Sequence, residues 1–344
     1  MAGGIGSRFW PMSTPQRPKQ FLDVLGIGKS LLQMTFERLQ NISPTENIYI
    51  LTNMDYKEMV LEQLPGLTPD QVLTEPERKN TAPCIAYAAA KIHAINPNAN
   101  LIVSPADHLI MQQENFKASI DAAINSAEQG RIATIGIQPT RPDTGYGYIE
   151  FDNAKELTPN AVFPVQQFRE KPDLETAKQF VAAGNFYWNS GIFIWKSSTV
   201  LNALKEFQPA LNGLFCSDLS AYNTEKEQEF VNHCFATCED ISIDFAVMEH
   251  ANNIDLVLSN FDWSDLGTWG SLDGHLDKDN NNNAHIGSNT HLFNTKNCII
   301  NIDDNKTAII DGLEDYIVIQ SDDKLMILRK ENEQELKAYL KAVK

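Results

Sequence analysis

The sequence has no long hydrophobic run and little cysteine. No stretch approaches the ~18 consecutive apolar residues of a membrane-spanning helix, and the N-terminus lacks the basic-then-apolar pattern of a secretory signal peptide. The five cysteines are an odd number and are scattered over 344 residues, unlike the dense framework of a disulfide-stabilised secreted protein. We therefore expect a reduced, cytoplasmic protein with no membrane segment.

Positive charge is also scarce. Lysine and arginine number 28 against 45 aspartates and glutamates, so the formal net charge is −17. This balance disfavours a surface for nucleic acid or for an anionic membrane. A phosphate-bearing ligand would have to be small, and a local basic pocket or a divalent cation would have to bind it. The length and the 42% hydrophobic content predict a globular chain of about two domains.

The few basic residues include three in the first twenty positions, MAGGIGSRFWPMSTPQRPKQ. Gly3, Gly4 and Gly6 allow the backbone to approach a ligand closely, because they carry no Cβ and tolerate positive φ. Arg8 and Lys19 add positive charge, and three prolines disfavour a helix over this stretch. The segment predicts an ordered loop that binds phosphates.

Two familiar phosphate-binding loops do not fit this sequence. A dinucleotide-binding turn needs a third glycine where the chain has Phe9. The run Gly28-Lys29-Ser30 resembles the end of a Walker loop, but Asp23 occupies the position of its first glycine. We interpret Ser30 with Gln33 as a helix capping box instead.

Residues up to about 143, and again from 254 to 258, alternate short apolar runs with amphipathic segments. This alternation predicts βαβ units and hence an α/β fold, with a mostly parallel, Rossmann-like sheet and helices on both faces. Ligands of such sheets bind beyond the carboxyl ends of strands. The predicted strands cover 47–53, 71–74, 101–104, 132–137 and 254–258, and the predicted helices cover 30–39, 56–64, 81–95, 116–129, 174–183, 198–207, 225–238 and 243–251.

The remainder of the chain divides differently. Residues 144–195 contain short extended pieces, which we interpret as an insertion over the sheet edge. The polar run DKDNNNN at 277–283 is the best candidate for a linker. We therefore predict a first domain over 1–276 and a small C-terminal β domain over 277–344 that ends in a helix over 331–343.

Two aspartates follow predicted strands. Asp107 lies just after the strand 101–104, and Asp265 lies seven residues after the strand that ends at Leu258. Both can reach the carboxyl edge of one sheet, where two carboxylates could hold Mg²⁺ together with substrate phosphates and water. The alternative is that each aspartate forms a turn or caps a helix. His108 fits an orienting role better than a metal ligand.

A second polar group lies in the inserted part. Glu170, Lys171 and Asn189 offer donors and acceptors suited to hydroxyl groups, and Gly147 permits close backbone approach. These residues predict polyol recognition, and turn chemistry at strand ends is the alternative.

The motifs together resemble those of a known family. The stretch GGIGSRFWPMSTPQRPKQF resembles the glycine-rich signature of sugar-phosphate nucleotidyltransferases, in the form carried by mannose-1-phosphate guanylyltransferases. The resemblance covers about residues 1–275, since further motifs follow in the order and roughly the spacing of the family. These are EPERKNTAPCIAYAA, SPADHLI, FREKP, YWNSGIFIW, ISIDFAVME and DWSDLGTWGSL.

The resemblance implies a reaction, a cofactor and a set of site residues. It implies transfer of GMP from GTP to α-D-mannose 1-phosphate, with Mg²⁺, giving GDP-mannose and pyrophosphate without a covalent intermediate. The residues that it implies are Arg8, Lys19, Asp107 and Asp265 for catalysis, with Asp107 and Asp265 as the metal pair; Ala2, Gly3, Gly4, Gly6, Ser7, Arg8, Lys19, Glu75, Asn80, Thr81 and Asp107 for the nucleotide; and Gly147, Glu170, Lys171 and Asn189 for the sugar phosphate.

The resemblance leaves alternatives. A nucleotidyltransferase for another sugar phosphate or another base has the same phosphate chemistry, and a non-catalytic regulatory relative would bind nucleotide-sugar without turnover. The region 284–330 resembles the small β-helix-like tail of the family's monofunctional form, and this resemblance implies a homodimer. Because the sequence ends at Lys344, a single activity is expected, without the isomerase domain of bifunctional relatives. The family also has an apolar strand before the signature, where this sequence has only Met1 and Ala2.

Overall fold

A computed structural model of the chain describes residues 1–4, 6–152 and 157–343. The chain forms two compact units. The first, which we call the sheet unit, consists of Gln40–Pro105 and Ile110–Trp263 together with Met1. The second, the pocket unit, consists of Ala2–Leu39, Ala106–Leu109 and Ser264–Lys344.

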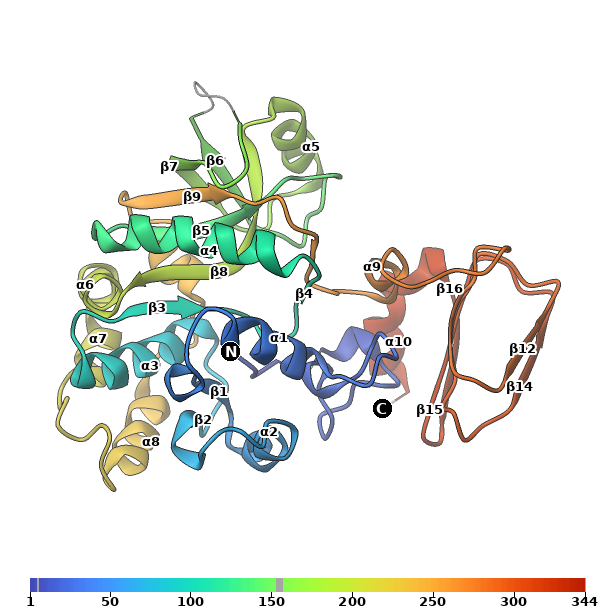
Figure 1. The fold of residues 1–344 in the computed structure, drawn as a ribbon, viewed down its shortest axis with the longest axis horizontal. Helices are drawn as coiled ribbons and strands as arrows, with labels where there is room; N and C mark the ends of the chain where they lie inside the picture. The colour runs from blue at the N-terminus through green and yellow to red at the C-terminus, as the bar shows by residue number, and fades with distance from the viewer. Residues whose placement is uncertain (5, 153–156, 344) are drawn as a thin grey trace. The chain divides into compact units, whose positions relative to one another are not determined.

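A six-stranded sheet forms the centre of the sheet unit (Figure 1). Its strands lie in the order β3-β8-β5-β9-β7-β6. A separate parallel pair is formed by β1 and β2, while β4 and β10 form another two-stranded pair. The bounds are β1 (Ile50–Asn53), β2 (Val72–Glu75), β3 (Asn100–Val103), β4 (Leu109–Ile110), β5 (Ile132–Ile137), β6 (Tyr148–Phe151), β7 (Val162–Arg169), β8 (Phe186–Lys196), β9 (Ile254–Leu258) and β10 (Trp263–Ser264).

The predicted α/β class is confirmed, and the strand directions refine it. β5 and β9 pair in parallel, and β3 runs in the same direction, as βαβ units require. The long strand β8 runs antiparallel between β3 and β5, so most neighbouring strands in this sheet are antiparallel. Periodicity could not predict this, because an apolar run carries no information about which way its strand enters the sheet.

Helices cover both faces of the sheet (Figure 1). Alternate residues of β8 enter two different cores: Phe193 and Trp195 pack with α3 and α6, whereas Ile192 and Ile194 pack with α4. No helix in the described ranges is long and apolar enough to cross a membrane. The helices of this unit are η3 (Thr45–Asn47), η4 (Met54–Tyr56), α2 (Lys57–Gln63), η5 (Pro69–Gln71), α3 (Thr81–Ile95), α4 (Gln113–Glu128), α5 (Leu174–Ala183), α6 (Ser197–Phe207), α7 (Pro209–Phe215), α8 (Glu227–Thr237) and η6 (Asp244–Met248).

The predicted helix over 243–251 is wrong in type and length. η6 is a π-helix of five residues, Asp244–Met248. Single π-turns often mark functional sites, because the widened turn re-aims side chains. Here the π-helix begins at a partly buried aspartate, Asp244.

The pocket unit begins with the glycine loop. Two short 3₁₀ turns, η1 (Ser7–Phe9) and η2 (Lys19–Phe21), lead to α1 (Leu31–Gln40). The capping box predicted before α1 is present, since the Ser30 N–H donates to Gln33 Oε1 over 2.9 Å and the Gln33 N–H donates to Ser30 Oγ over 3.2 Å. This confirms that Gly28-Lys29-Ser30 belongs to a helix start.

The C-terminal part of the pocket unit is a small parallel β-solenoid. β11, β13 and β15 stack in parallel, β12 and β14 form a second parallel sheet, and β16 returns antiparallel beside β15 (Figure 1). A small apolar core lies within it. The bounds of the elements from α9 to the C-terminus are α9 (Trp269–Asp273), β11 (Ala284–Ile286), β12 (Thr290–Phe293), β13 (Ile299–Asn301), β14 (Ala308–Asp311), β15 (Tyr316–Ser321), β16 (Lys324–Arg329), η7 (Lys330–Glu335) and α10 (Leu336–Ala342).

Two expectations about this part need correction. The polar run 277–283 is an ordered turn, because the buried Asn283 side chain donates to the Thr295 carbonyl over 2.9 Å and accepts from the Cys298 N–H over 3.0 Å. The predicted terminal helix over 331–343 is divided into a 3₁₀ segment, η7, and the short helix α10.

Candidate functional site

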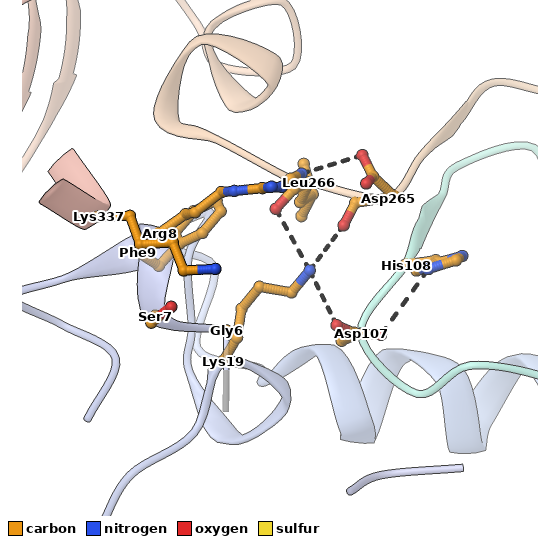
Figure 2. Close-up of a pocket in the computed structure, with 11 residues that line it drawn as sticks. Gly6, Ser7, Arg8, Phe9, Lys19, Asp107, His108, Asp265, Leu266 and Lys337 are labelled. Carbon is orange, nitrogen blue, oxygen red and sulfur yellow. Dashed lines mark hydrogen bonds and ion pairs between the residues drawn. The ribbon is translucent and has the colours of Figure 1, made fainter. Parts of the chain in front are cut away.

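A pocket of about 310 Å³ lies within the pocket unit (Figure 2). Four segments that are far apart in the sequence contribute to it: the glycine loop, the short segment Ala106–Leu109, the turn after β10, and α10. Its lining residues are Gly6, Ser7, Arg8, Phe9, Lys19, Asp107, His108, Asp265, Leu266, Gly267 and Lys337.

Lys19 lies at the centre of the pocket. Its ammonium group is 2.9 Å from Asp107 Oδ2 and donates hydrogen bonds to the carbonyls of Asp265, over 2.6 Å, and of Leu266, over 3.3 Å (Figure 2). Only 6% of the side chain is exposed. Gly6 packs directly against it, with φ of +66°, and a Cβ at this position would lie 2.4 Å from Lys19 Cβ. The position therefore requires glycine for both space and backbone conformation.

Both predicted aspartates contact this lysine, Asp107 through its carboxylate and Asp265 through its backbone carbonyl. Burial alone would raise the pKa of Asp107, but the ion pair with Lys19 outweighs it and lowers the pKa below its ordinary value. Asp107 is therefore ionised at neutral pH. Asp265 accepts a hydrogen bond from the Gly267 N–H over 3.0 Å, in a turn where Leu266 has φ of +45°.

His108 lies beside Asp107, with Nε2 3.9 Å from Asp107 Oδ1. Burial lowers the pKa of His108 below its ordinary value of 6.5, although the Asp107 carboxylate opposes this shift. The ring is therefore neutral at pH 7, and this fits the orienting role expected from the sequence.

Two further cations line the pocket. Arg8 belongs to η1, and Lys337 belongs to α10 at the other end of the chain. Among the residues that the structure describes, no carboxylate forms an ion pair with either of them. Lys337 was not predicted, because a lysine on a short C-terminal helix carries no signal in the sequence that distinguishes it from any other surface lysine.

The predicted sugar-phosphate residues form a second cluster, in the sheet unit. Asn189 at the middle of β8 donates from its backbone N–H to the Gly147 carbonyl over 2.8 Å. Glu170 is buried to 8% side-chain exposure and pairs with Lys171 over 2.5 Å, while its other oxygen, Oε2, has no hydrogen-bond partner among the described residues. A Cβ on Gly147 would lie 2.4 Å from this oxygen, so a side chain here would have to displace the Glu170 carboxylate.

Asp244 completes this cluster and was not predicted. Its Oδ1 accepts a hydrogen bond from the Asn189 amide over 2.9 Å. Burial, and then the nearby Glu170 carboxylate, raise the pKa of Asp244 to about 6. The motif ISIDFAVME contains this aspartate. Because the sequence predicted an ordinary helix there, it gave no sign of the π-turn that directs Asp244 toward Asn189.

The residues expected for the base and ribose also lie in the sheet unit. Glu75 ends β2, and burial raises its pKa while the Cys84 thiol donates a hydrogen bond to it. Asn80 has φ of +64° and caps α3 by accepting from the Thr81 N–H over 3.0 Å. Thr81 Oγ1 accepts from the Ile243 N–H over 2.9 Å.

The predicted site residues thus form separate groups within the two units. Arg8, Lys19, Asp107 and Asp265 line one pocket of the pocket unit. In the same unit the Ala2 carbonyl accepts from the Gln20 amide over 2.6 Å, and a Cβ on Gly4 would meet no neighbour within 4 Å. The groups around Glu170 and around Glu75 belong to the sheet unit.

Comparison with known proteins identifies the class. The model of the nucleotidyl transferase family matches residues 1–281, and the model of a mannoseP isomerase/GMP-like beta-helix domain matches residues 289–342. The chain belongs to the nucleotidyl transferase family and is an enzyme of that class. The resemblance inferred from the ordered motifs is confirmed.

The relatives are more specific. The chain is similar to a mannose-1-phosphate guanylyltransferase of Salmonella montevideo, with 37% identity over 100% of this chain and 73% of that protein. It is also 37% identical to the alginate biosynthesis protein AlgA of Pseudomonas aeruginosa, over 99% of this chain and 70% of that protein. A crystal structure of a mannose-1-phosphate geranyltransferase from Thermus thermophilus has a TM-score of 0.88 and 29% identity, covering 100% of this chain and 97% of that one.

The Asp244 cluster leads to a prediction for stability. The pKa of this carboxyl is about 6 in the folded protein against an ordinary 3.8, so the folded state binds the proton more tightly than the unfolded chain does. The stability that this proton contributes is complete below pH ~4 and is lost as the pH rises through ~6. Asp244→Asn, which resembles the protonated acid, should therefore unfold at a higher temperature than wild type at pH 8. The difference should shrink as the pH falls through ~6 and vanish below pH ~4.

The measurement is thermal unfolding followed by circular dichroism across this pH range. Asp121→Asn is the control, because Asp121 is an exposed helix residue paired with Lys117 and should show no such pH dependence. If the unfolding temperatures of Asp244→Asn and wild type differed equally at high and low pH, Asp244 would not be the group that binds this proton.

Proposed function

We propose that this enzyme transfers GMP from GTP to α-D-mannose 1-phosphate and releases pyrophosphate, with Mg²⁺ as cofactor. The observation that carries the proposal is the buried Lys19 ammonium held against Asp107 in a glycine-loop pocket that also contains Arg8. Guanine and mannose are proposed because relatives similar over the whole of this chain are named mannose-1-phosphate guanylyltransferases.

Electrostatic repulsion is the main obstacle to this reaction, because both substrates are polyanions. Arg8 and Lys19 would offset the charge of the triphosphate, and the backbone of the glycine loop would donate N–H groups to it. An oxygen of the sugar phosphate attacks the α-phosphorus in line, the bond from that phosphorus to the bridging oxygen of the β-phosphate breaks, and pyrophosphate leaves with the electron pair. The nucleophile is already ionised, so no general base is needed.

Asp107 and Asp265 are the residues that would hold Mg²⁺. Two carboxylates are suitable oxygen donors for this ion, which completes its shell with phosphate oxygens and water. Within the described ranges no group of three or more histidine, cysteine or acidic side chains could hold a metal, so substrate phosphates would have to supply further ligands. When bound, the ion would neutralise charge on the reacting phosphates.

The sheet-unit clusters would select the substrates. Glu170 presents a buried oxygen without a partner among the described residues, which suits a sugar hydroxyl because a buried acceptor is stabilised by a donor. Lys171, paired with Glu170 over 2.5 Å, would meet the sugar phosphate, and Asn189 would contact the sugar. Glu75, Asn80 and Thr81 would line the pocket for the base and ribose.

The domain division is part of the same proposal. Residues 1–276 would form the catalytic domain, with 144–195 as the sugar-binding insertion, and residues 277–344 would form the β domain with its terminal helix. Residues 153–156 of the insertion lie outside the described residues.

The substrate assignment is tested by measuring pyrophosphate release with a panel of nucleoside triphosphates against sugar 1-phosphates. We expect GTP with mannose 1-phosphate to give the highest kcat/KM, because a site built to hydrogen-bond one base rejects another by leaving buried polar groups unpaired. Preference for glucose 1-phosphate or for a deoxynucleotide would support the alternative nucleotidyltransferase. Binding without turnover of any pair would favour a regulatory relative.

The catalytic pocket is tested by Lys19→Ala and Asp265→Ala. Each should lower kcat by more than ~10²-fold, because preorganised charge at the reacting phosphates is lost. Lys29→Ala is the control, since Lys29 lies in the same N-terminal segment but forms an exposed pair with Glu37 and should turn over normally. Near-normal turnover of either pocket variant, at an unchanged unfolding temperature, would remove that residue from the catalytic set.

The enzyme is also proposed to form a homodimer through the solenoid. β16 is an edge strand, and its Leu325 and Ile327 side chains are 58% and 56% exposed. An apolar, unpaired edge strand favours pairing with another chain, and a second copy offers the same surface. Light scattering after size exclusion should give twice the 38.6 kDa chain mass, and Ile327→Lys should give the monomer. A monomeric wild type would contradict the proposal.

A further inference from the structure

The C-terminal helix α10 is attached to the same apolar core as the glycine loop. Leu336, 4% exposed, and Leu340, one turn later, pack in the cluster that contains Phe9 and Trp269. The Phe9 and Trp269 rings lie 4.7 Å apart between centroids. Just before α10, Glu333 accepts a hydrogen bond from the Gly270 N–H over 2.8 Å. The helix is therefore held against the turn that follows Asp265.

This attachment places Lys337 in the pocket. The residue follows Leu336, so its side chain leaves the helix beside the buried face. It lines the pocket together with Ser7 and Arg8 (Figure 2). Lys341, one turn further along α10, is exposed and does not line the pocket.

The charges around Lys337 indicate what it binds. No carboxylate in the described part of the chain forms an ion pair with Lys337 or with Arg8, although acidic residues outnumber basic ones by 45 to 28. Two cations in one concave pocket, neither engaged in an internal salt bridge there, attract an anion. Lys19, in contrast, already pairs with Asp107.

We propose that Lys337 binds the β- and γ-phosphates of the nucleotide, and hence the pyrophosphate that leaves. Figure 2 shows Lys337, Ser7 and Arg8 on one side of Lys19, and Asp107 with His108 on the other. The α-phosphorus, where the proposed reaction takes place, would lie near the aspartates. The β- and γ-phosphates would then lie on the side of the pocket that contains Arg8 and Lys337. This inference rests on the proposed function, and it gives the C-terminal helix a direct role in substrate binding.

The chemistry of the side chain fits this role. A lysine ammonium is a compact charge with three donors on a flexible stem. It can follow phosphate oxygens as the bond to the α-phosphorus breaks, and it can release pyrophosphate afterwards. Lys337 is exposed in the described structure, so it can reach a ligand without breaking an ion pair.

The test compares KM for ligands that carry the departing β- and γ-phosphates with KM for ligands that do not. Lys337→Gln should raise KM for GTP, and KM for pyrophosphate in the reverse reaction, by about tenfold, as loss of a hydrogen bond to a charged group predicts. KM for mannose 1-phosphate and for GDP-mannose should stay within about twofold, because neither carries the departing phosphates. Lys337→Arg should restore most of the affinity, and Lys341→Gln is the matched control on the same helix.

Several results would overturn the inference. One is an unchanged KM for GTP and pyrophosphate in Lys337→Gln, and another is an equal rise for all four ligands, which would indicate structural damage. If Lys341→Gln raised KM for GTP and pyrophosphate by as much, the cause would be the overall positive charge of α10 and not a contact between Lys337 and phosphate. An unfolding temperature equal to that of wild type is required of each variant, and Lys337→Met, with the same expected rise in KM, supplies the second test if Lys337→Gln fails to fold.

Calorimetric titration with magnesium pyrophosphate separates this inference from the proposed function. If wild type lacks guanylyltransferase activity but binds pyrophosphate, and Lys337→Gln weakens that binding about tenfold, the inference stands and the proposed substrate pair falls. If wild type turns over GTP with mannose 1-phosphate and Lys337→Gln binds pyrophosphate normally, the proposed function stands and the inference falls.

Discussion

The buried Lys19 ammonium is the interaction on which the rest of the pocket depends. A desolvated cation is tolerated only when its protons are all occupied, and here the Asp107 carboxylate and the carbonyls of Asp265 and Leu266 occupy them. One side chain therefore holds together two segments that are far from it in the sequence. Removal of its charge would leave the partly buried Asp107 carboxylate without this partner, so the same contact determines both the local stability and the electrostatics of the site.

The apolar core beneath the pocket explains why the C-terminal part belongs to this unit. Phe9, Trp269 and Leu336 come from the glycine loop, the turn after Asp265, and α10. They share one cluster with Ile299 of β13 and with Ile317 and Ile319 of β15. A β-solenoid this small buries little surface by itself, so its packing on the loop stabilises both. The position of Lys337 is a consequence of that packing.

The cluster around Glu170 differs from the surroundings of Lys19, because some of its buried polar groups are not satisfied. Glu170 Oε2 is buried without a partner among the described residues, and Asp244 beside it has a pKa raised to about 6. Both features cost stability in the described structure, where Asp244 and Glu170 carry like charge. Binding sites commonly retain such unsatisfied groups, because a ligand satisfies them when it binds.

Local features of the sequence were enough to predict the α/β class and the capping box at Ser30, because apolar alternation and caps can be read along the chain. The family resemblance carried by the ordered motifs implied that Lys19, Asp107 and Asp265 serve one site, and all three line one pocket. Local features could not predict the antiparallel direction of β8, the π-turn that aims Asp244, or the place of Lys337. Each of these depends on which distant segment packs against which, and an apolar residue does not specify its partner. The shared core of Phe9, Trp269 and Leu336 places a lysine near the C-terminus beside an arginine near the N-terminus, and that core forms only when the chain has folded.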